Sequence, residues 1–141
     1  MTAPAGRGML DTSTVIPLGQ LPDAADLPDA MVVSAVTLAE LSVGPLVART
    51  AKERGARQAH LQQAESDFGS ITFDAQAARA FGRVAASLRS AGRKPAARAY
   101  DALIAAAAIA AGVPLYTCDP EDFAGIDDLE VRAVPHQDRG E

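Results

Sequence analysis

Residues 100–112 read YDALIAAAAIAAG, and they form the most apolar helical stretch of the chain. Almost every position from 102 to 111 is Ala, Leu or Ile, and Gly112 follows where a helix would end. A helix that is apolar all round must be buried on every side. The stretch is too short to cross a membrane, so we expect it in the interior of a soluble domain.

Short apolar runs and longer helical patterns on either side predict the remaining elements. Strands are expected at residues 8–10, 31–33, 71–73, 113–118 and 129–134, the first continuing into the β-branched and hydroxyl residues 12–16. Helices are expected at residues 34–49, 50–68 and 74–88, with Gly44 and Pro45 kinking or ending the first and Gly92 stopping the last. Prolines between residues 17 and 30 leave room for a short helix at most. This alternation predicts an α/β domain whose parallel sheet is covered by helices on both faces.

Length and composition suit one compact domain. The 141 residues are 48% hydrophobic but only 4% aromatic, with no Trp, so the core is expected to consist of closely packed Ala, Leu, Val and Ile. We expect this domain at residues 9–135, between a flexible N-terminal tail at residues 1–8 and a C-terminal tail at residues 136–141.

The single cysteine and the net charge restrict the possible functions. Cys118 has no partner for an internal disulfide and cannot form a thiolate zinc site, so a reducing, cytoplasmic location is expected. Residues 1–8 lack the apolar core of a signal peptide. A net charge of −5 argues against a general nucleic-acid coat, so any RNA contact must be local or bridged by cations.

Acidic residues follow the predicted strands. Asp11 comes after the first strand, Glu40 lies in the helix after the second, Asp101 opens the buried helix, and Asp119 follows the fourth strand. In open parallel sheets, ligands bind beyond the carboxyl ends of the strands, so these four carboxylates could meet at one edge. Buried carboxylates either shift their pKa or hold a cation. The pattern therefore favours a metal site.

Each of these carboxylates also has a purely structural interpretation. Thr37 and Glu40 fit a helix capping box, and Asp101 could cap its own helix. Asp119 precedes a proline, as a cap with Pro at the first helical position does, and Asp11 could form a turn with the hydroxyl residues after it. These alternatives do not explain why all four acidic residues fall at the same edge of the sheet.

Four sequence blocks resemble the signature blocks of VapC-type toxins of the PIN-domain ribonuclease family. The blocks are MLDTS at residues 9–13, SAVTLAEL at 34–41, DALIAA at 101–106 and LYTCDPEDF at 115–123. They occur in the family's order and roughly at its spacing, and the resemblance extends from residue 9 to about residue 134.

The resemblance implies a PIN fold with a five-stranded parallel sheet and a catalytic quartet of Asp11, Glu40, Asp101 and Asp119 that holds Mg²⁺ or Mn²⁺. It also implies a homodimer that cuts RNA and is inhibited by a small VapB-type antitoxin encoded beside it. Asp122 competes with Asp119 for the fourth position. We choose Asp119, because strand alternation points it to the same side as Thr117.

Several further residues are assigned from their positions. Thr12, Ser13 and Thr117 are expected to support the quartet, with Thr117 helping to orient a water, whereas Cys118 is expected to pack in the core. Candidates for RNA phosphate contacts are Arg93, Lys94 and Arg98, which could equally form a solvated surface. Two other functions stay open: a catalytically silent PIN-like binding module, and a PIN nuclease of RNA processing that is not a toxin.

Overall fold

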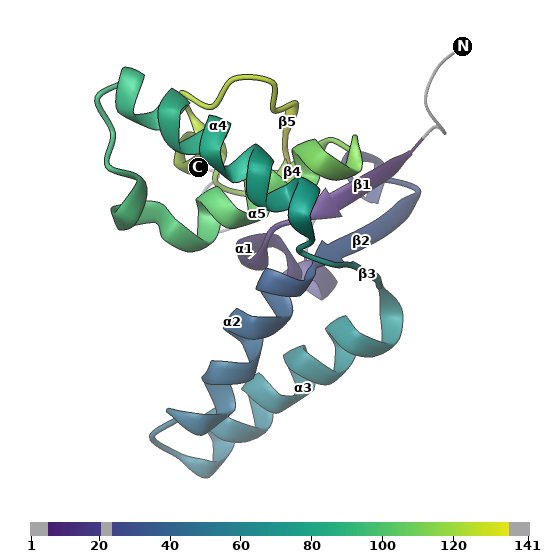
Figure 1. The fold of residues 1–141 in the computed structure, drawn as a ribbon. Coiled ribbons are helices and arrows are strands. Elements are labelled where there is room, and N and C mark those ends of the chain that lie inside the picture. The colour runs from purple at the N-terminus through teal and green to yellow at the C-terminus, as the bar shows by residue number, and fades with distance from the viewer. Residues whose placement is uncertain (1–5, 21–23, 136–141) are drawn as a thin grey trace.

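The computed structural model describes residues 6–20 and 24–135 of the chain and contains a five-stranded, fully parallel sheet (Figure 1). Its strand order is β3-β2-β1-β4-β5, so β1 lies at the centre. The strands are β1 Arg7–Leu10, β2 Ala30–Ser34, β3 Gly69–Ile71, β4 Leu115–Thr117 and β5 Val131–Ala133. The predicted five-stranded parallel sheet is confirmed.

Helices cover both faces of the sheet because neighbouring residues of each strand point to opposite sides. Met9 and Val32 face a core closed by α4 and α5, whereas Leu10 and Val33 face a second core closed by α1, α2 and α3. The helices are α1 Thr12–Val15, α2 Ala35–Leu46, α3 Ala51–Asp67, α4 Ala75–Ser90 and α5 Ala99–Ala111. Short 3₁₀ turns are η1 Leu18–Gln20, η2 Ala24–Asp26, η3 Pro95–Arg98 and η4 Pro120–Phe123. In Figure 1, α2 and α3 form a hairpin that projects away from the sheet.

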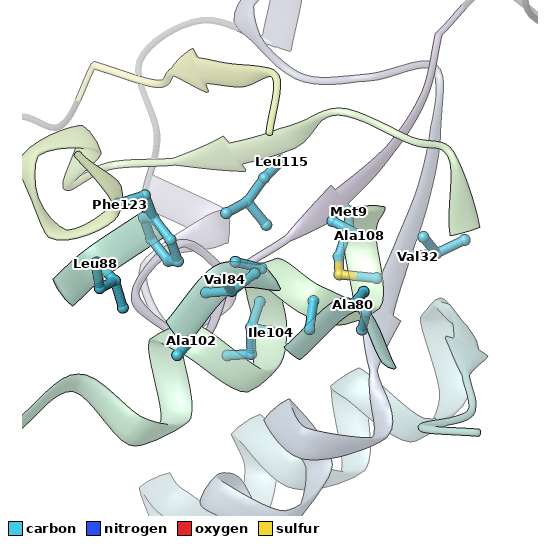
Figure 2. Close-up of a cluster of buried hydrophobic side chains, with 13 residues drawn as sticks. Met9, Val32, Ala80, Val84, Leu88, Ala102, Ile104, Ala108, Leu115 and Phe123 are labelled. Carbon is cyan, nitrogen blue, oxygen red and sulfur yellow. The ribbon is translucent and has the colours of Figure 1, made fainter. Parts of the chain in front are cut away.

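Helix α5 is the most deeply buried helix, as its composition predicts. Residues 104–108 are almost inaccessible to solvent, and they pack between the sheet and α4 (Figure 2). Alanine side chains let α4 and α5 approach closely, while Val84 and Leu88 fill the space between them. Gly112 ends the helix in the left-handed conformation, with φ of +70°, which costs glycine little.

The first strand ends earlier than the sequence predicts. Residues 12–16 were expected to extend it, but Thr12–Val15 forms the helix α1. The backbone carbonyl of Asp11 accepts hydrogen bonds from the amides of Thr14 and Val15, both at 3.1 Å, and these bonds close the turn. The Thr12 hydroxyl also donates to Glu40, and the Thr14 hydroxyl accepts from the Cys118 amide, so tertiary contacts override the preference of β-branched residues for strands.

Other boundaries also differ from the predictions. Strand β3 lies at Gly69–Ile71 and not at 71–73, because it pairs in register with Val32–Ser34 of β2. Pro45 lies inside α2, which ends one residue later at Leu46. Of the expected tails, residues 1–5 and 136–141 lie outside the described residues, and Arg7 and Gly8 belong to β1. Within the described ranges, no helix is both long and apolar enough to cross a membrane.

Candidate active site and metal centre

The carboxylate of Asp11 lies at the carboxyl end of the central strand and is only 3% exposed. Three hydroxyl groups donate hydrogen bonds to it: Thr14 to Oδ1 at 2.6 Å, and Ser13 and Thr117 to Oδ2 at 2.9 and 2.8 Å. Ser13 and Thr14 reach the carboxylate because α1 begins at the residue after it, whereas Thr117 comes from the adjacent strand β4. Asp11 is therefore held in a fixed orientation from two elements.

Burial dominates the electrostatics of this carboxylate. The pKa of Asp11 is raised: loss of solvent is the largest cause, the three hydroxyl hydrogen bonds lower the pKa, and the nearby charge of Asp119 raises it. Both oxygens of the Asp11 carboxylate thus accept hydrogen bonds, but burying its negative charge still costs free energy.

Glu40 projects from α2 toward α1 at the same edge of the sheet. Thr12 donates a hydrogen bond of 2.6 Å to Glu40 Oε1, and its oxygen lies 3.1 Å from the hydroxyl of Thr37. The capping-box interpretation of Thr37 and Glu40 is wrong, because Ser34 caps α2 by accepting a hydrogen bond from the amide of Val36. Burial raises the pKa of Glu40, the Thr12 hydrogen bond lowers it, and the charge of Asp11 raises it again.

Asp101 lies in the first turn of α5. No side chain caps this helix, which begins two residues earlier, so Asp101 does not serve as its N-cap. Burial first, and then the charges of Asp122, Asp11 and Glu40, raise the pKa of Asp101 to about 6, and Arg98 lowers it. The charges of Asp11 and Glu40 reach Asp101, so the structure brings these three predicted residues together from α5, α2 and the residue that follows β1.

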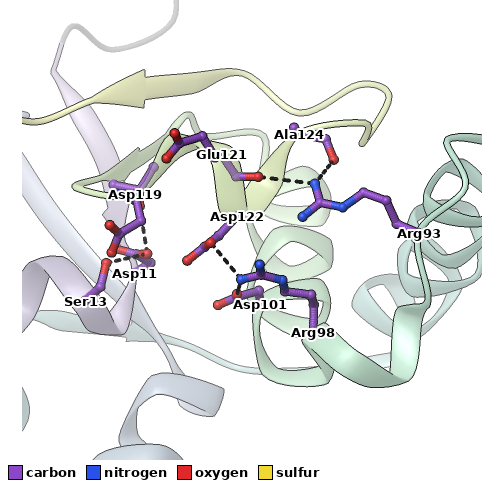
Figure 3. A network of polar contacts seen from close by, with 10 residues as sticks. Asp11, Ser13, Arg93, Arg98, Asp101, Asp119, Glu121, Asp122 and Ala124 are labelled. Atoms are coloured by element: carbon purple, nitrogen blue, oxygen red, sulfur yellow. Dashed lines mark hydrogen bonds and ion pairs between the residues drawn. The ribbon is translucent and has the colours of Figure 1, made fainter.

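Two acidic residues complete the site: Asp119, which immediately precedes η4, and Asp122 within η4. Asp119 donates its backbone amide to the Thr117 hydroxyl at 2.9 Å, which places it beside Asp11, and its side chain makes no capping hydrogen bond. Asp122 lies near Asp101 and accepts a hydrogen bond of 2.6 Å from Arg98 (Figure 3). The amide of Asp122 donates a hydrogen bond of 3.0 Å to the backbone carbonyl of Asp119, so the turn that follows Asp119 carries Asp122 toward Asp101.

The structure gives the three basic candidates different surroundings. The guanidinium of Arg93 donates to the backbone carbonyls of Glu121 and Ala124, at 3.2 and 2.6 Å. Arg98 pairs with Asp122 and lies 3.8 Å from Asp101, whereas Lys94 is exposed. The two arginines therefore bind protein oxygens in this structure, and Arg98 lies directly at the carboxylates.

Two hollows adjoin the acidic residues, and Glu40 borders both. One of about 320 Å³ is lined by Glu40 and residues 96–101, and the other, of about 250 Å³, lies between α1, α2 and α3. The second is lined by Thr12, Ile16, Glu40, Leu41, Gly44, Arg57 and His60. The acidic edge is thus accessible from two sides.

The donor chemistry fits a hard divalent cation. All candidate ligands are carboxylate oxygens, which Mg²⁺ and Mn²⁺ prefer. Within residues 6–20 and 24–135, no three His, Cys, Asp or Glu side chains are arranged to enclose one ion. A complete protein cage is not required, because Mg²⁺ commonly binds through one or two carboxylates, several waters and a substrate phosphate.

Comparison with known proteins agrees with this geometry. The family model described as "PIN domain" matches residues 9–129. The chain belongs to the PIN domain family. It is 40% identical over 128 residues to a PIN-type relative, Ribonuclease VapC5 of Mycobacterium tuberculosis, with 89% of this chain and 91% of the relative covered. The VapC-type resemblance of its sequence blocks is confirmed.

Solved structures show the same PIN fold. A crystal structure of VapBC-5 from Mycobacterium tuberculosis, a member of the VapBC family of toxin-antitoxin systems, matches with a TM-score of 0.81 and 40% identity. The match covers 93% of this chain and 100% of that chain. VapBC2 from Rickettsia felis, bound to a DNA fragment from its promoter, matches with a TM-score of 0.72 and 25% identity, over 90% of this chain and 98% of that chain.

Replacing Asp101 by Asn is expected to stabilise the metal-free PIN domain at neutral pH but not at acidic pH. The folded-state pKa of Asp101 is about 6 against an ordinary 3.8, so the folded protein binds this proton more tightly than the unfolded chain. The resulting stability is fully present below pH 3.8 and is lost as the pH rises through about 6. Asn carries no charge at any pH.

Calorimetry in the presence of a chelator measures this difference. We expect Asp101→Asn to melt near the wild type at about pH 4 and a few degrees above it at about pH 7.5. Asp127→Asn, which changes an exposed side chain, is the matched control and should show no such change. An offset between Asp101→Asn and wild type that is identical at both pH values would contradict the assignment.

Proposed function

We propose that this chain, a ribonuclease of the VapC type, is the toxin component of a type II toxin–antitoxin system and a Mg²⁺- or Mn²⁺-dependent endoribonuclease. The observation that carries the proposal is the convergence of acidic side chains from β1, α2, α5 and η4 at one edge of the sheet. Three of them, Asp11, Glu40 and Asp101, have raised pKa values caused chiefly by burial. Such crowding is unfavourable without a cation and therefore suggests a function.

The division of roles follows from how each carboxylate is held. Asp11, fixed by three hydroxyl groups, and Asp101 would be the principal ligands of the ion, with Asp119 or Asp122 as the next. A bound divalent ion would offset charge on the scissile phosphate and lower the pKa of a water molecule. Glu40, which borders both hollows, is placed to orient the attacking water. Thr117 acts as a positioning residue, since it holds Asp11 and the backbone of Asp119 together.

Basic residues at the rim would position the RNA. Lys94 is exposed on the segment that leads to α5 and can contact phosphate oxygens, whereas Arg98, 41% exposed beside the carboxylates, would first have to leave Asp122. Arg93 is occupied by two backbone carbonyls and is the weakest of the three candidates. Such contacts set the register of an RNA strand without reading its sequence.

The hollow between α1, α2 and α3 is the surface we assign to a VapB-type antitoxin. Exposed apolar side chains lie at its margin on α1 and farther along at the end of α2: Ile16, Val43, Leu46 and Val47. Glu40 supplies a negative charge on its wall. An antitoxin segment with apolar residues and one Arg or Lys directed at Glu40 would complement this surface. In this proposal the toxin acts as a homodimer in the cytoplasm, where its RNA substrate is present.

Substitution of the carboxylates tests the catalytic assignment. In Mn²⁺, Asp11→Asn and Asp101→Asn should each lower the cleavage of single-stranded RNA by at least about a hundredfold, because even outer partners of metal ligands contribute 10- to 100-fold. Asp127→Asn should cleave within a few-fold of wild type. Gel-resolved cleavage of an RNA panel is the measurement, and a wild type that cuts none of the panel would favour a silent binding module.

The antitoxin surface is tested with the VapB-type protein that this proposal expects to be encoded beside this chain's gene. Leu46→Ser removes an apolar side chain that is 85% exposed, and its loss should weaken binding by roughly tenfold or more if that side chain is buried in the complex. Glu40→Gln should weaken both antitoxin binding and RNA cleavage. Titration calorimetry gives the affinities, with Asp127→Asn as the control. If both Leu46→Ser and Glu40→Gln bind the antitoxin with wild-type affinity, the antitoxin binds another face of the protein.

A further inference from the structure

One aromatic side chain differs from the rest in its exposure. The chain has four Phe and two Tyr residues, all within the described ranges. Phe68, Phe123 and Tyr116 are buried, two more Phe residues are partly buried, and Tyr100 alone is exposed, at 52%. Burying an aromatic ring is strongly favourable, so an exposed one in an aromatic-poor chain needs an explanation.

Tyr100 lines the same hollow as two of the proposed catalytic carboxylates. The hollow of about 320 Å³ is bounded by Glu40 on one side and by residues 96–101 on the other. Its volume is at the lower end of the range for small-molecule sites, roughly 300–1,000 Å³. Tyr100 immediately precedes Asp101 in the first turn of α5, so an occupant of the hollow lies within reach of both the ring and the acidic residues.

The composition of the wall leaves space beside the ring. Apart from Arg98, the residues that lead to Tyr100 and line the hollow are Ala96, Ala97 and Ala99. Three methyl side chains and an aromatic ring form a surface with few bulky groups. A flat ligand can therefore approach the ring without displacing a large neighbour.

We propose that Tyr100 is a base-stacking residue, which holds one nucleobase of a single-stranded RNA next to the phosphate that the carboxylates act on. The inference rests on the proposed ribonuclease function and deepens it by naming a residue that binds the substrate through its base. Stacking on an aromatic ring tolerates every base, since each has a π face.

The negative charge of the protein favours a contact with RNA that does not depend on charge, such as base stacking. The chain carries a net charge of −5, its site is acidic, and two of its three rim cations bind protein oxygens. Phosphate contacts alone therefore provide little attraction for RNA. Stacking does not depend on charge, so it supplies affinity where electrostatics are unfavourable, and it orients the strand as well.

The test compares Tyr100→Leu with Tyr100→Phe, which keeps the ring. Tyr100→Leu should raise the KM for single-stranded RNA, or weaken its binding, by about five- to 150-fold, the range found when a stacking residue is removed. Tyr100→Phe should stay within about twofold of wild type, because the ring face and not the hydroxyl group makes the contact. Melting temperatures of both variants report whether the fold is intact.

A spectroscopic measurement separates stacking from a merely structural role. The fluorescent base 2-aminopurine is placed at successive positions of a single-stranded RNA, and binding is measured by stopped-flow in Mn²⁺, before the RNA is cut. Quenching at one position in wild type and Tyr100→Phe, and its absence in Tyr100→Leu, would support the proposal. This readout remains valid even if the wild type proves unable to cut RNA. A failure of the stacking proposal can therefore be distinguished from a failure of the proposed ribonuclease function.

Two outcomes would overturn the inference. One is a Tyr100→Leu variant that binds, quenches and cleaves RNA as the wild type does. The other is a variant with unchanged RNA binding but lost affinity for the antitoxin or for a second copy of the chain, which would assign the exposed ring to a protein interface.

Discussion

The buried carboxylate of Asp11 is the constraint on which the rest of the site depends. It is 3% exposed at the end of the central strand, and three hydroxyl groups from α1 and β4 surround it. An ionised carboxylate in such a position is tolerated only when its oxygens are satisfied. That requirement forces the chain to turn into α1 directly after β1 and fixes Thr117 in the neighbouring strand. Asp119 follows, because its amide binds the same Thr117 hydroxyl.

Removal from solvent determines the pKa values of the carboxylates at the site. Burial is the largest cause of the raised pKa values of Asp11, Glu40 and Asp101, and charge repulsion between them adds to it. In this structure Arg98 partly offsets the repulsion by pairing with Asp122 near Asp101. An ion bound at Asp101 would compete with that arginine, which could then turn to a phosphate of the substrate. The same acidity explains why an RNA strand would need cations and a stacking surface to bind here.

Residue patterns predicted the order of the elements and the four acidic residues Asp11, Glu40, Asp101 and Asp119, which the structure brings to one edge of the sheet. Alternating apolar runs identify a covered parallel sheet, and its carboxyl edge is where these residues were expected. The helix α1 was missed because its β-branched residues favour a strand locally, whereas the contacts of the Thr12 hydroxyl with Glu40 and of the Thr14 hydroxyl with the Cys118 amide exist only in the folded chain. The shift of β3 by two residues has a similar cause, since its register is set by pairing with β2. Tyr100 could not be singled out, because exposure beside a hollow is a property of the folded chain.

The acidic residues are proposed to share one charged site that binds a divalent cation. Titration calorimetry of Mn²⁺ in two buffers with different ionisation enthalpies measures how many protons are released on binding. Because the pKa of Asp101 is about 6, we predict proton release near pH 6 that disappears near pH 8, and a smaller release at pH 6 in Asp101→Asn. Absence of Mn²⁺ binding at both pH values, or a proton release that Asp101→Asn leaves unchanged, would contradict a shared cation site at these carboxylates.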